Sequence, residues 1–299
     1  MRIYIRTPLV NKSKMIPHTV EHCAGNVCWN VSDFFDFSRW LDWEISIDYT
    51  CFIPDKWVKY EDVLEKIFQP IEKKKVNYEH KVLKEELSEP SYAQKLSEKI
   101  LKKFVDPEIS TNHYKSISWE EAKEYHEKYY KLENVIVVDE EKDYKVIFKW
   151  FSPEKKKCRN LEKRKEKFRY KGNRYILYFF KSYNAEEYRK MFFCYELIDS
   201  YLYFMNRLNK QQYYPLINYF FQNTYAYYIL VEDTDYSRLD QDFFEQWKKY
   251  FLNMLKNWFY KEDFFLNEYF YGIPKNRKEV IQICKNFSRA EFKEFLELK

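Results

Sequence analysis

The pentapeptide His18-Thr19-Val20-Glu21-His22 holds the side chains of this sequence that are best suited to metal chemistry. On a helix, His18 and His22 stand one turn apart on one face, where both imidazoles can bind the same metal ion. Glu21 follows His18 by three residues and borders that face. A zinc ion held by two histidines needs a third protein ligand and an open position for water, whose proton a nearby carboxylate can accept. The motif H-x-x-E-H therefore predicts a hydrolytic zinc site.

The third ligand decides between this prediction and a simpler one, because two histidines on one helix face are commonly ordinary surface residues. A second helix is predicted over residues 78–87, YEHKVLKEEL, from the spacing of its apolar residues. On it, Glu79 and Glu86 lie seven residues apart, which is two turns along one face. Without the histidine motif, these two carboxylates would be interpreted as part of a solvated helix face.

The remaining pattern predicts a mixture of strands and helices. In the first half, strands are predicted at 2–9, 43–54, 134–138 and 145–151, and helices near Pro17, at 60–68, at 78–87 and at 118–130, the last opened by the capping box Ser118-Trp119-Glu120-Glu121. In the second half, strands are predicted at 175–180, 216–221 and 226–231, and helices at 185–207, at 242–259 and after Ser288. Because strands and helices do not alternate strictly, the order favours two α+β domains over one parallel sheet.

Length and composition set the domain organisation. The 299 residues are enough for two domains, which we place at 1–150 and 171–299, joined by a basic linker at 151–170. Within that linker the basic run 155–167 is interpreted as a solvated connection, with an acidic partner as the alternative. The net charge of +5 comes from interspersed charges and predicts no nucleic-acid partner. Aromatic residues make up 21% of the chain and predict aromatic cores.

The six cysteines include no C-x-x-C pair, which favours reduced thiols in an intracellular protein. Cys23 and Cys28 follow the histidine motif, but their offset of five residues suits neither one helix face nor a zinc knuckle. The N-terminal sequence lacks the pattern of a signal peptide, and no apolar run reaches the length of a membrane span. We therefore expect a cytoplasmic protein that has no membrane partner.

The order strand, H-x-x-E-H helix, strand, helix and E-x6-E helix resembles the pitrilysin, insulinase and mitochondrial-processing-peptidase family of zinc peptidases, the inverzincins. In that family the second glutamate of the pair is the third zinc ligand and the first supports the site, which implies Glu86 as ligand and Glu79 as support. The segment 116–138 is similar to the family's capped helix ending in Tyr-Tyr, followed by an asparagine and a strand. The separation of His22 and Glu86, 86 − 22 = 64 residues, is shorter than usual for the family.

The resemblance implies two related domains, each a largely antiparallel sheet packed with helices, which together form half of a clamshell. It also implies Zn²⁺ as cofactor, peptides as substrates of an endopeptidase or oligopeptidase, Glu21 as general base and Tyr219 as a donor to the oxyanion. The stretch that supplies an arginine and a tyrosine in active relatives has Lys210, Gln211 and Tyr219 here. We therefore expect a homodimer, or a heterodimer with a related subunit that completes the cleft. The alternatives are a non-catalytic or partner-dependent subunit and a metal-binding structural protein.

Overall fold

The computed structural model describes residues 1–8, 13–25, 41–45, 49–104, 114–142, 145–149, 162–181, 185–209, 217–220, 226–232, 236, 238–257 and 277–297. The chain divides into two compact units, unit 1 (Met1–Ser152) and unit 2 (Pro153–Lys299). Each unit combines helices with a sheet whose paired strands are antiparallel. The predicted α+β class is confirmed. None of the described helices is both long and apolar enough to cross a membrane.

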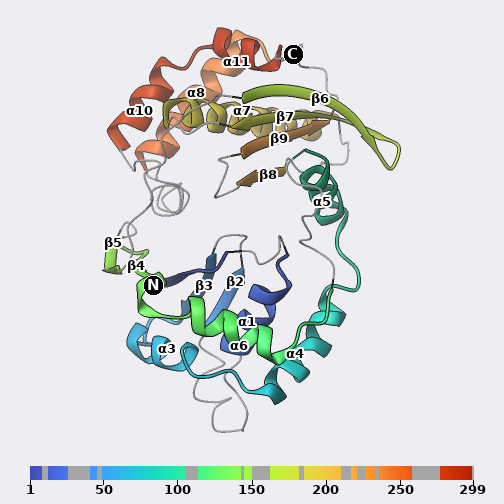
Figure 1. The fold of residues 1–299 in the computed structure, drawn as a ribbon. Coiled ribbons are helices and arrows are strands. Elements are labelled where there is room, and N and C mark those ends of the chain that lie inside the picture. The colour runs from blue at the N-terminus through green and yellow to red at the C-terminus, as the bar shows by residue number, and fades with distance from the viewer. Residues whose placement is uncertain are drawn as a thin grey trace. The chain divides into compact units, whose positions relative to one another are not determined.

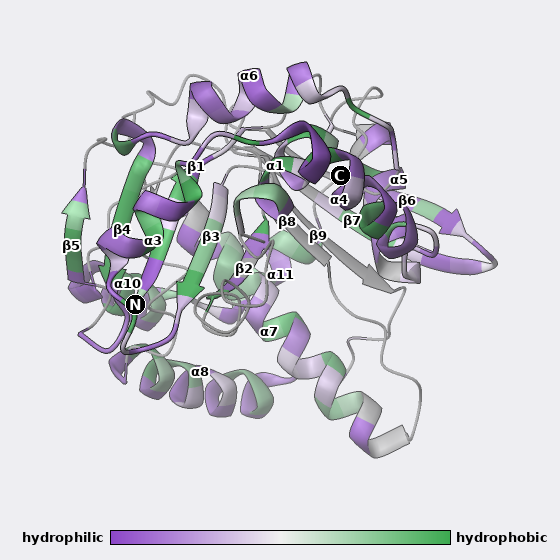
Figure 2. Cartoon of the chain, turned by 90° about the horizontal axis from the view of Figure 1, so that it is seen from below, coloured by the Kyte–Doolittle hydropathy of each residue, from purple (hydrophilic) through white to green (hydrophobic). Residues whose placement is uncertain are grey.

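Unit 1 is built on a sheet with the strand order β2-β3-β1-β4-β5. Its strands are β1 (Arg2–Arg6), β2 (Leu41–Ile45), β3 (Tyr49–Pro54), β4 (Val135–Asp139) and β5 (Lys145–Lys149). In the central strand, Ile3 is paired with Phe52 on one side and Val137 on the other, and all three belong to the buried core. The apolar residues of β3 and β4 stand out in the hydropathy colouring of Figure 2.

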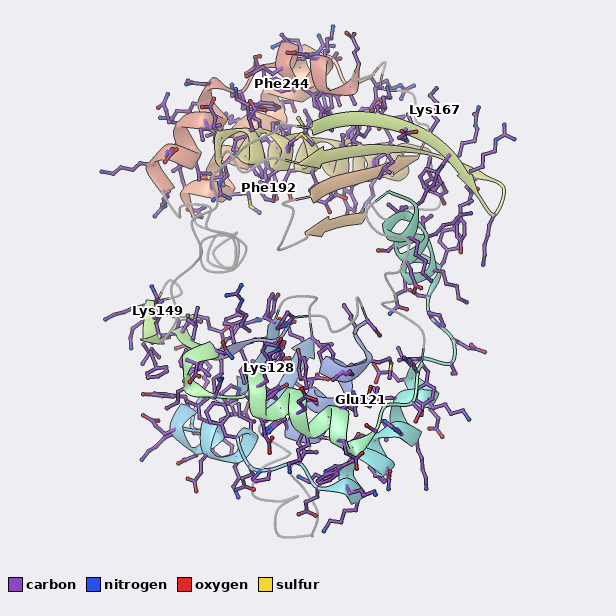
Figure 3. All side chains as sticks on the ribbon, viewed as in Figure 1. Glu121, Lys128, Lys149, Lys167, Phe192 and Phe244 are labelled. Atoms are coloured by element: carbon purple, nitrogen blue, oxygen red, sulfur yellow. The ribbon has the colours of Figure 1, made fainter. Side chains whose placement is uncertain are left out.

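The helices of unit 1 are α1 (Met15–Gly25), α3 (Tyr60–Ile67), α4 (Lys73–Glu86), α5 (Tyr92–Phe104) and α6 (Trp119–Tyr129), and a short 3-10 helix, η2 (Leu132–Asn134), precedes β4 (Figure 1). Helix α1 contacts α3, α4, α6 and the strands β2 and β3. The predicted capping box of α6 is present, because the Ser118 hydroxyl accepts from the Glu121 backbone N–H and the Glu121 carboxylate accepts from that of Ser118. Glu121 is labelled in Figure 3.

Unit 2 has a sheet with the strand order β6-β7-β9-β8. Its elements are β6 (Glu162–Tyr170), β7 (Asn173–Lys181), α7 (Ala185–Asn209), β8 (Ile217–Phe220), β9 (Ala226–Glu232), α8 (Gln241–Lys256), α10 (Arg277–Asn286) and α11 (Arg289–Leu296). β6 and β7 are joined by Lys171 and Gly172, which both have positive φ, 49° and 86°. Two such residues are what a tight two-residue hairpin needs, and glycine takes this conformation without a steric cost.

The core of unit 2 is aromatic. Phe193 of α7 lies edge-on to Phe251 of α8 with ring centroids 5.6 Å apart, and Trp247 stacks on Phe251 at 5.1 Å. Figure 3 labels Phe192 and Phe244, which lie on the same two helices. The predicted aromatic filling of the cores is confirmed for this unit.

Two predicted elements were wrong in extent. The single strand predicted at 43–54 is a hairpin, since β2 ends at Ile45 and β3 begins at Tyr49 and runs back antiparallel to it. The linker predicted at 151–170 contains the strand β6 from Glu162 onward, paired with β7 along its whole length. Residues 151–161 of that linker lie outside the described residues. This strand was not predicted because its run of lysine and arginine residues does not show the alternation of apolar and polar residues that is typical of a strand.

Candidate metal centre

Helix α1 positions the two histidines. The helix starts at Met15, two residues earlier than predicted, and Pro17 lies in its first turn, where its missing N–H costs no hydrogen bond. Val20 is fully buried in the core and fixes the rotation of the helix. On the adjoining face the rings of His18 and His22 lie 4.9 Å apart between centroids. The predicted one-turn spacing of the histidines is therefore present.

Glu86, the last residue of α4, reaches both histidines. One carboxylate oxygen lies 3.5 Å from His18 Nε2 and the other lies 3.3 Å from His22 Nε2. One ligand atom from each of the three residues can be chosen so that all lie within 4.8 Å of one another. Since α1 and α4 pack directly on each other, this convergence depends on a helix contact inside unit 1.

Glu79 supports His22 from the side opposite to Glu86. Its carboxylate is 1% exposed and lies 3.1 Å from His22 Nδ1. A carboxylate can only accept in this contact, so Nδ1 carries the proton and Nε2 is left to face Glu86 and His18. A second carboxylate that fixes the tautomer of a ligating histidine is typical of metal sites.

Glu21 is a buried carboxyl group without a hydrogen bond to one of its oxygens. The residue is 2% exposed, and among the described residues Oε2 has no hydrogen-bond partner. That oxygen lies 3.8 Å from Nε2 of His18 and 3.8 Å from Nε2 of His22. Burial raises the pKa of Glu21 to about 8, against the opposing charge of His22 and with the help of Glu86 and Glu79.

The pKa values of the two histidines shift in opposite directions. Burial lowers the pKa of His18 to about 3, and the neighbouring charges of His22 and Lys14 act in the same direction. Burial also acts to lower the pKa of His22, but the hydrogen bond with Glu79 and the charges of Glu21, Glu79 and Glu86 outweigh it and raise that pKa. His18 is therefore a neutral imidazole at neutral pH, as a metal ligand must be.

The donor set fits zinc. It offers two imidazole nitrogens and one carboxylate oxygen, the ligand types that catalytic zinc sites use with one open position. Ligand atoms of a tetrahedral zinc site lie about 3.4 Å apart, given bonds of about 2.1 Å. The distances of 3.5 Å and 3.3 Å from the two Glu86 oxygens to the histidines are close to that spacing, and with one atom from each residue the three donors lie within 4.8 Å, so binding would draw them closer together. A cation beside Glu21 would also compensate the burial of its Oε2, which has no hydrogen bond among the described residues.

Sequence reasoning missed Lys75, which lies beside this cluster. Lys75 is 9% exposed, and burial lowers its pKa while the charges of Cys23, Glu72 and Glu79 act to raise it. Its position four residues before Glu79 puts it on the same face of α4, and that spacing is the signal that could have revealed it. Cys23 is buried as a free thiol, and burial raises its pKa to about 12.

The structure thus brings together His18, Glu21, His22, Glu79 and Glu86. Tyr219 belongs to β8 of unit 2, but its side chain lies outside the part of the chain that is described, so its role stays a prediction. Cys28, Lys210 and Gln211 also lie outside the described residues. Of the three other histidines, His126 is buried and its Nε2 donates to the Ile67 carbonyl, which is a structural contact.

Comparison of the chain with protein-family models, with curated proteins and with solved structures found no significant match. What can be said about function therefore depends on the residues and their geometry.

Proposed function

We propose that this protein is a zinc-dependent peptidase, an endopeptidase or oligopeptidase that hydrolyses peptide bonds with Glu21 as the general base. One observation carries the proposal: the buried Oε2 of Glu21, which has no hydrogen bond among the described residues, lies 3.8 Å from Nε2 of both histidines, whose Nε2 atoms also meet Glu86. A structural metal site does not need a buried carboxylate beside its ligands. A hydrolytic site needs one to accept a proton.

The residues have separate tasks in this proposal. His18, His22 and Glu86 hold Zn²⁺, which when bound acts as a Lewis acid on water and on the substrate carbonyl. Glu21 accepts a proton from the attacking water and returns it to the leaving amine, a task that favours a pKa close to the working pH. In the chain without metal, burial raises the pKa of Glu21 to about 8, and the charge of a bound cation would act to lower it. Glu79 holds the His22 ring through Nδ1, and Tyr219 is proposed to donate to the developing oxyanion.

The proposal also covers how the two units are related and whether the active form is a dimer. We propose that the two units are related domains of a half-clamshell and that the active form is a homodimer, or a heterodimer with a related subunit. The stretch with Lys210 and Gln211 lacks the arginine that active relatives use, and this lack supports a partner. A cytoplasmic location is proposed as well. Gel filtration with multi-angle scattering tests the assembly, because a monomer that cleaves peptides efficiently would contradict it.

The test of the activity is Glu21→Gln, which keeps the shape of the side chain and removes the base. We expect the variant to bind one zinc per chain like the wild type and to cleave a mixed peptide library about 10³-fold more slowly. Glu124→Gln is the matched control, because Glu124 is an exposed residue of α6 in the same unit. Unchanged cleavage by Glu21→Gln would exclude the proposed mechanism. Zinc binding by a wild type that cleaves no peptide, alone or with a partner, would favour a structural metal site.

A further inference from the structure

A groove lies between α7 and α8 of unit 2, far along the sequence from the histidine motif. It has a volume of about 910 Å³. Its lining includes aromatic residues of both helices: the adjacent Tyr203 and Phe204 on α7, and on α8 Phe243, Trp247 and Tyr250, which lie about one turn apart. A volume of this size is at the upper end of what ligand pockets have.

The aromatic rings at this groove are unusually open to solvent. Tyr203 is 51%, Phe204 is 40% and Tyr250 is 60% exposed, and they are three of the seven large hydrophobic residues that are exposed among the described ones. The aromatic composition of the chain would scatter exposed rings over the surface. Their concentration on one concave surface instead indicates a binding site.

The charge of the groove lining favours a cationic ligand. Among the described residues, its lining contains Asp199, Asp240 and Asp242 and one cation, Arg238, so these four side chains have a formal charge of −2, whereas the whole chain carries +5. Asp240 also caps α8 by accepting from the Phe243 N–H at 2.8 Å. Carboxylates beside exposed aromatic faces are what a lysine or arginine side chain binds, by ion pairing and by the cation–π interaction.

One of these rings already binds a cation within the chain. The guanidinium of Arg207 lies over the ring of Tyr203, 5.0 Å from its centroid. Along α8 the lining extends from Asp242 to Tyr250, which is about 12 Å at 1.5 Å per residue. An extended peptide covers this distance with about four residues. The dimensions therefore favour a segment of polypeptide over a single small cation.

We propose that the groove between α7 and α8 binds a short peptide segment that carries lysine or arginine. A cationic group of the peptide pairs with Asp242, and its aliphatic stem lies on Tyr250. This site is independent of the metal centre, and its existence does not depend on the proposed peptidase activity.

The test is calorimetric titration of the full-length chain carrying Glu21→Gln, so that the probe is not consumed. The probe is a blocked peptide with two lysines separated by one leucine, compared with peptides in which norleucine or glutamate replaces both lysines. We expect the lysine peptide to bind at low ionic strength and more weakly as salt is added. Binding of the norleucine or glutamate peptide with equal affinity would overturn the proposal, as would equally tight binding of tetramethylammonium.

Substitutions at Tyr250 and Asp242 test whether the peptide binds in the groove. Tyr250→Ala and Asp242→Asn should each weaken binding of the lysine peptide about fivefold. Tyr250→Leu keeps an apolar side chain, and should weaken binding in the same way because it lacks the ring. The matched controls are Tyr78→Ala, at a tyrosine of α4 that is 52% exposed, and Asp62→Asn, in the first turn of α3 as Asp242 is in that of α8. Binding by the groove variants that equals binding by these controls would refute the site.

Discussion

Units 1 and 2 bury different kinds of side chain. Of the ten buried polar or charged residues whose side chains are described, nine belong to unit 1 and one, Arg189, to unit 2. In unit 1 these include Glu21, Glu79 and Lys75 around the histidines. In unit 2 the described interior is built from stacked and tilted rings, and the carboxylates Asp199 and Asp242 line an open groove instead.

This difference distinguishes side chains that stabilise a fold from side chains that are retained for a ligand. Burying a carboxyl group costs free energy unless a partner compensates it, and aromatic packing has no such cost. Unit 2 can therefore be stable through its core alone, while unit 1 carries a cluster that a purely structural core would not need. We infer that the cluster of unit 1 is retained for a ligand, and the predictions below test this contrast.

Phe251→Ala should have the largest effect on stability and should act only on unit 2. The ring packs against Phe192, Phe193 and Trp247, so its removal leaves a cavity that lowers the free energy of unfolding of the unit by about 3–5 kcal/mol. Amide hydrogen exchange should become faster in α7 and α8 and stay unchanged in α1 and α4. Phe251→Leu is the control and should cost about 1 kcal/mol. A loss of zinc affinity in either variant would contradict the inference that zinc binding does not depend on the core of unit 2.

Glu21→Gln should stabilise the metal-free protein at alkaline pH. Because the pKa of Glu21 is raised from 4.5 to about 8, the folded chain holds its proton more tightly than the unfolded chain. Its contribution to stability is therefore complete below about pH 4.5 and is lost as the pH rises toward 8. In urea unfolding with a chelator present, the variant should be more stable than the wild type by about 2–4 kcal/mol at pH 8 and nearly equal at pH 5. A difference that is the same at both pH values would contradict the assigned burial of this charge.

Removal of zinc should destabilise unit 1 selectively. A ligand that binds only the folded state adds about 2.7 kcal/mol when its free concentration exceeds the Kd about 100-fold. Chelation should therefore speed amide exchange in α1 and at the end of α4, with no change in α8. Exchange that rises equally in both units would mean that the metal is not bound by the histidine cluster.

Glu79→Gln should have the smallest of these effects. It weakens the partner of His22 Nδ1 without removing a ligand, so zinc affinity should fall about 10–100-fold while the stoichiometry stays at one. Glu85→Gln is the matched control because Glu85 is an exposed neighbour on the same helix. Competition with a fluorescent chelator measures the zinc affinity of both variants. Equal affinities would show that Glu79 has no role in holding His22.

Much of the fold could be predicted from local patterns. The capping boxes at Ser118 and Ser288 start α6 and α11 as predicted, because two hydrogen bonds at each helix end are encoded within four residues. The boundary between β2 and β3 was missed because the alternation of apolar and polar residues continues without a break through residues 43–50, WEISIDYT. No element was assigned at 92–104, where α5 lies.

The candidate site was predictable in part, and for a physical reason. The spacing of His18 and His22 is local and follows from one helical turn, so the sequence determines it directly. The approach of Glu86 depends on how α4 packs on α1, which no local pattern encodes, and only the family resemblance suggested it. The burial of Glu21 and of Lys75 depends on the same packing. Sequence therefore identified the residue types, and tertiary structure determined their electrostatics.

The most direct test of the metal centre is the zinc content of the purified chain, measured by mass spectrometry after equilibration with zinc and removal of the excess. We predict one zinc per chain for the wild type and for Glu21→Gln, and none for His22→Ala, which removes a ligand. His126→Ala is not a ligand variant and should retain one zinc if it folds. A wild type without zinc, or a His22→Ala variant that retains it, would contradict the proposal that His18, His22 and Glu86 form a metal site.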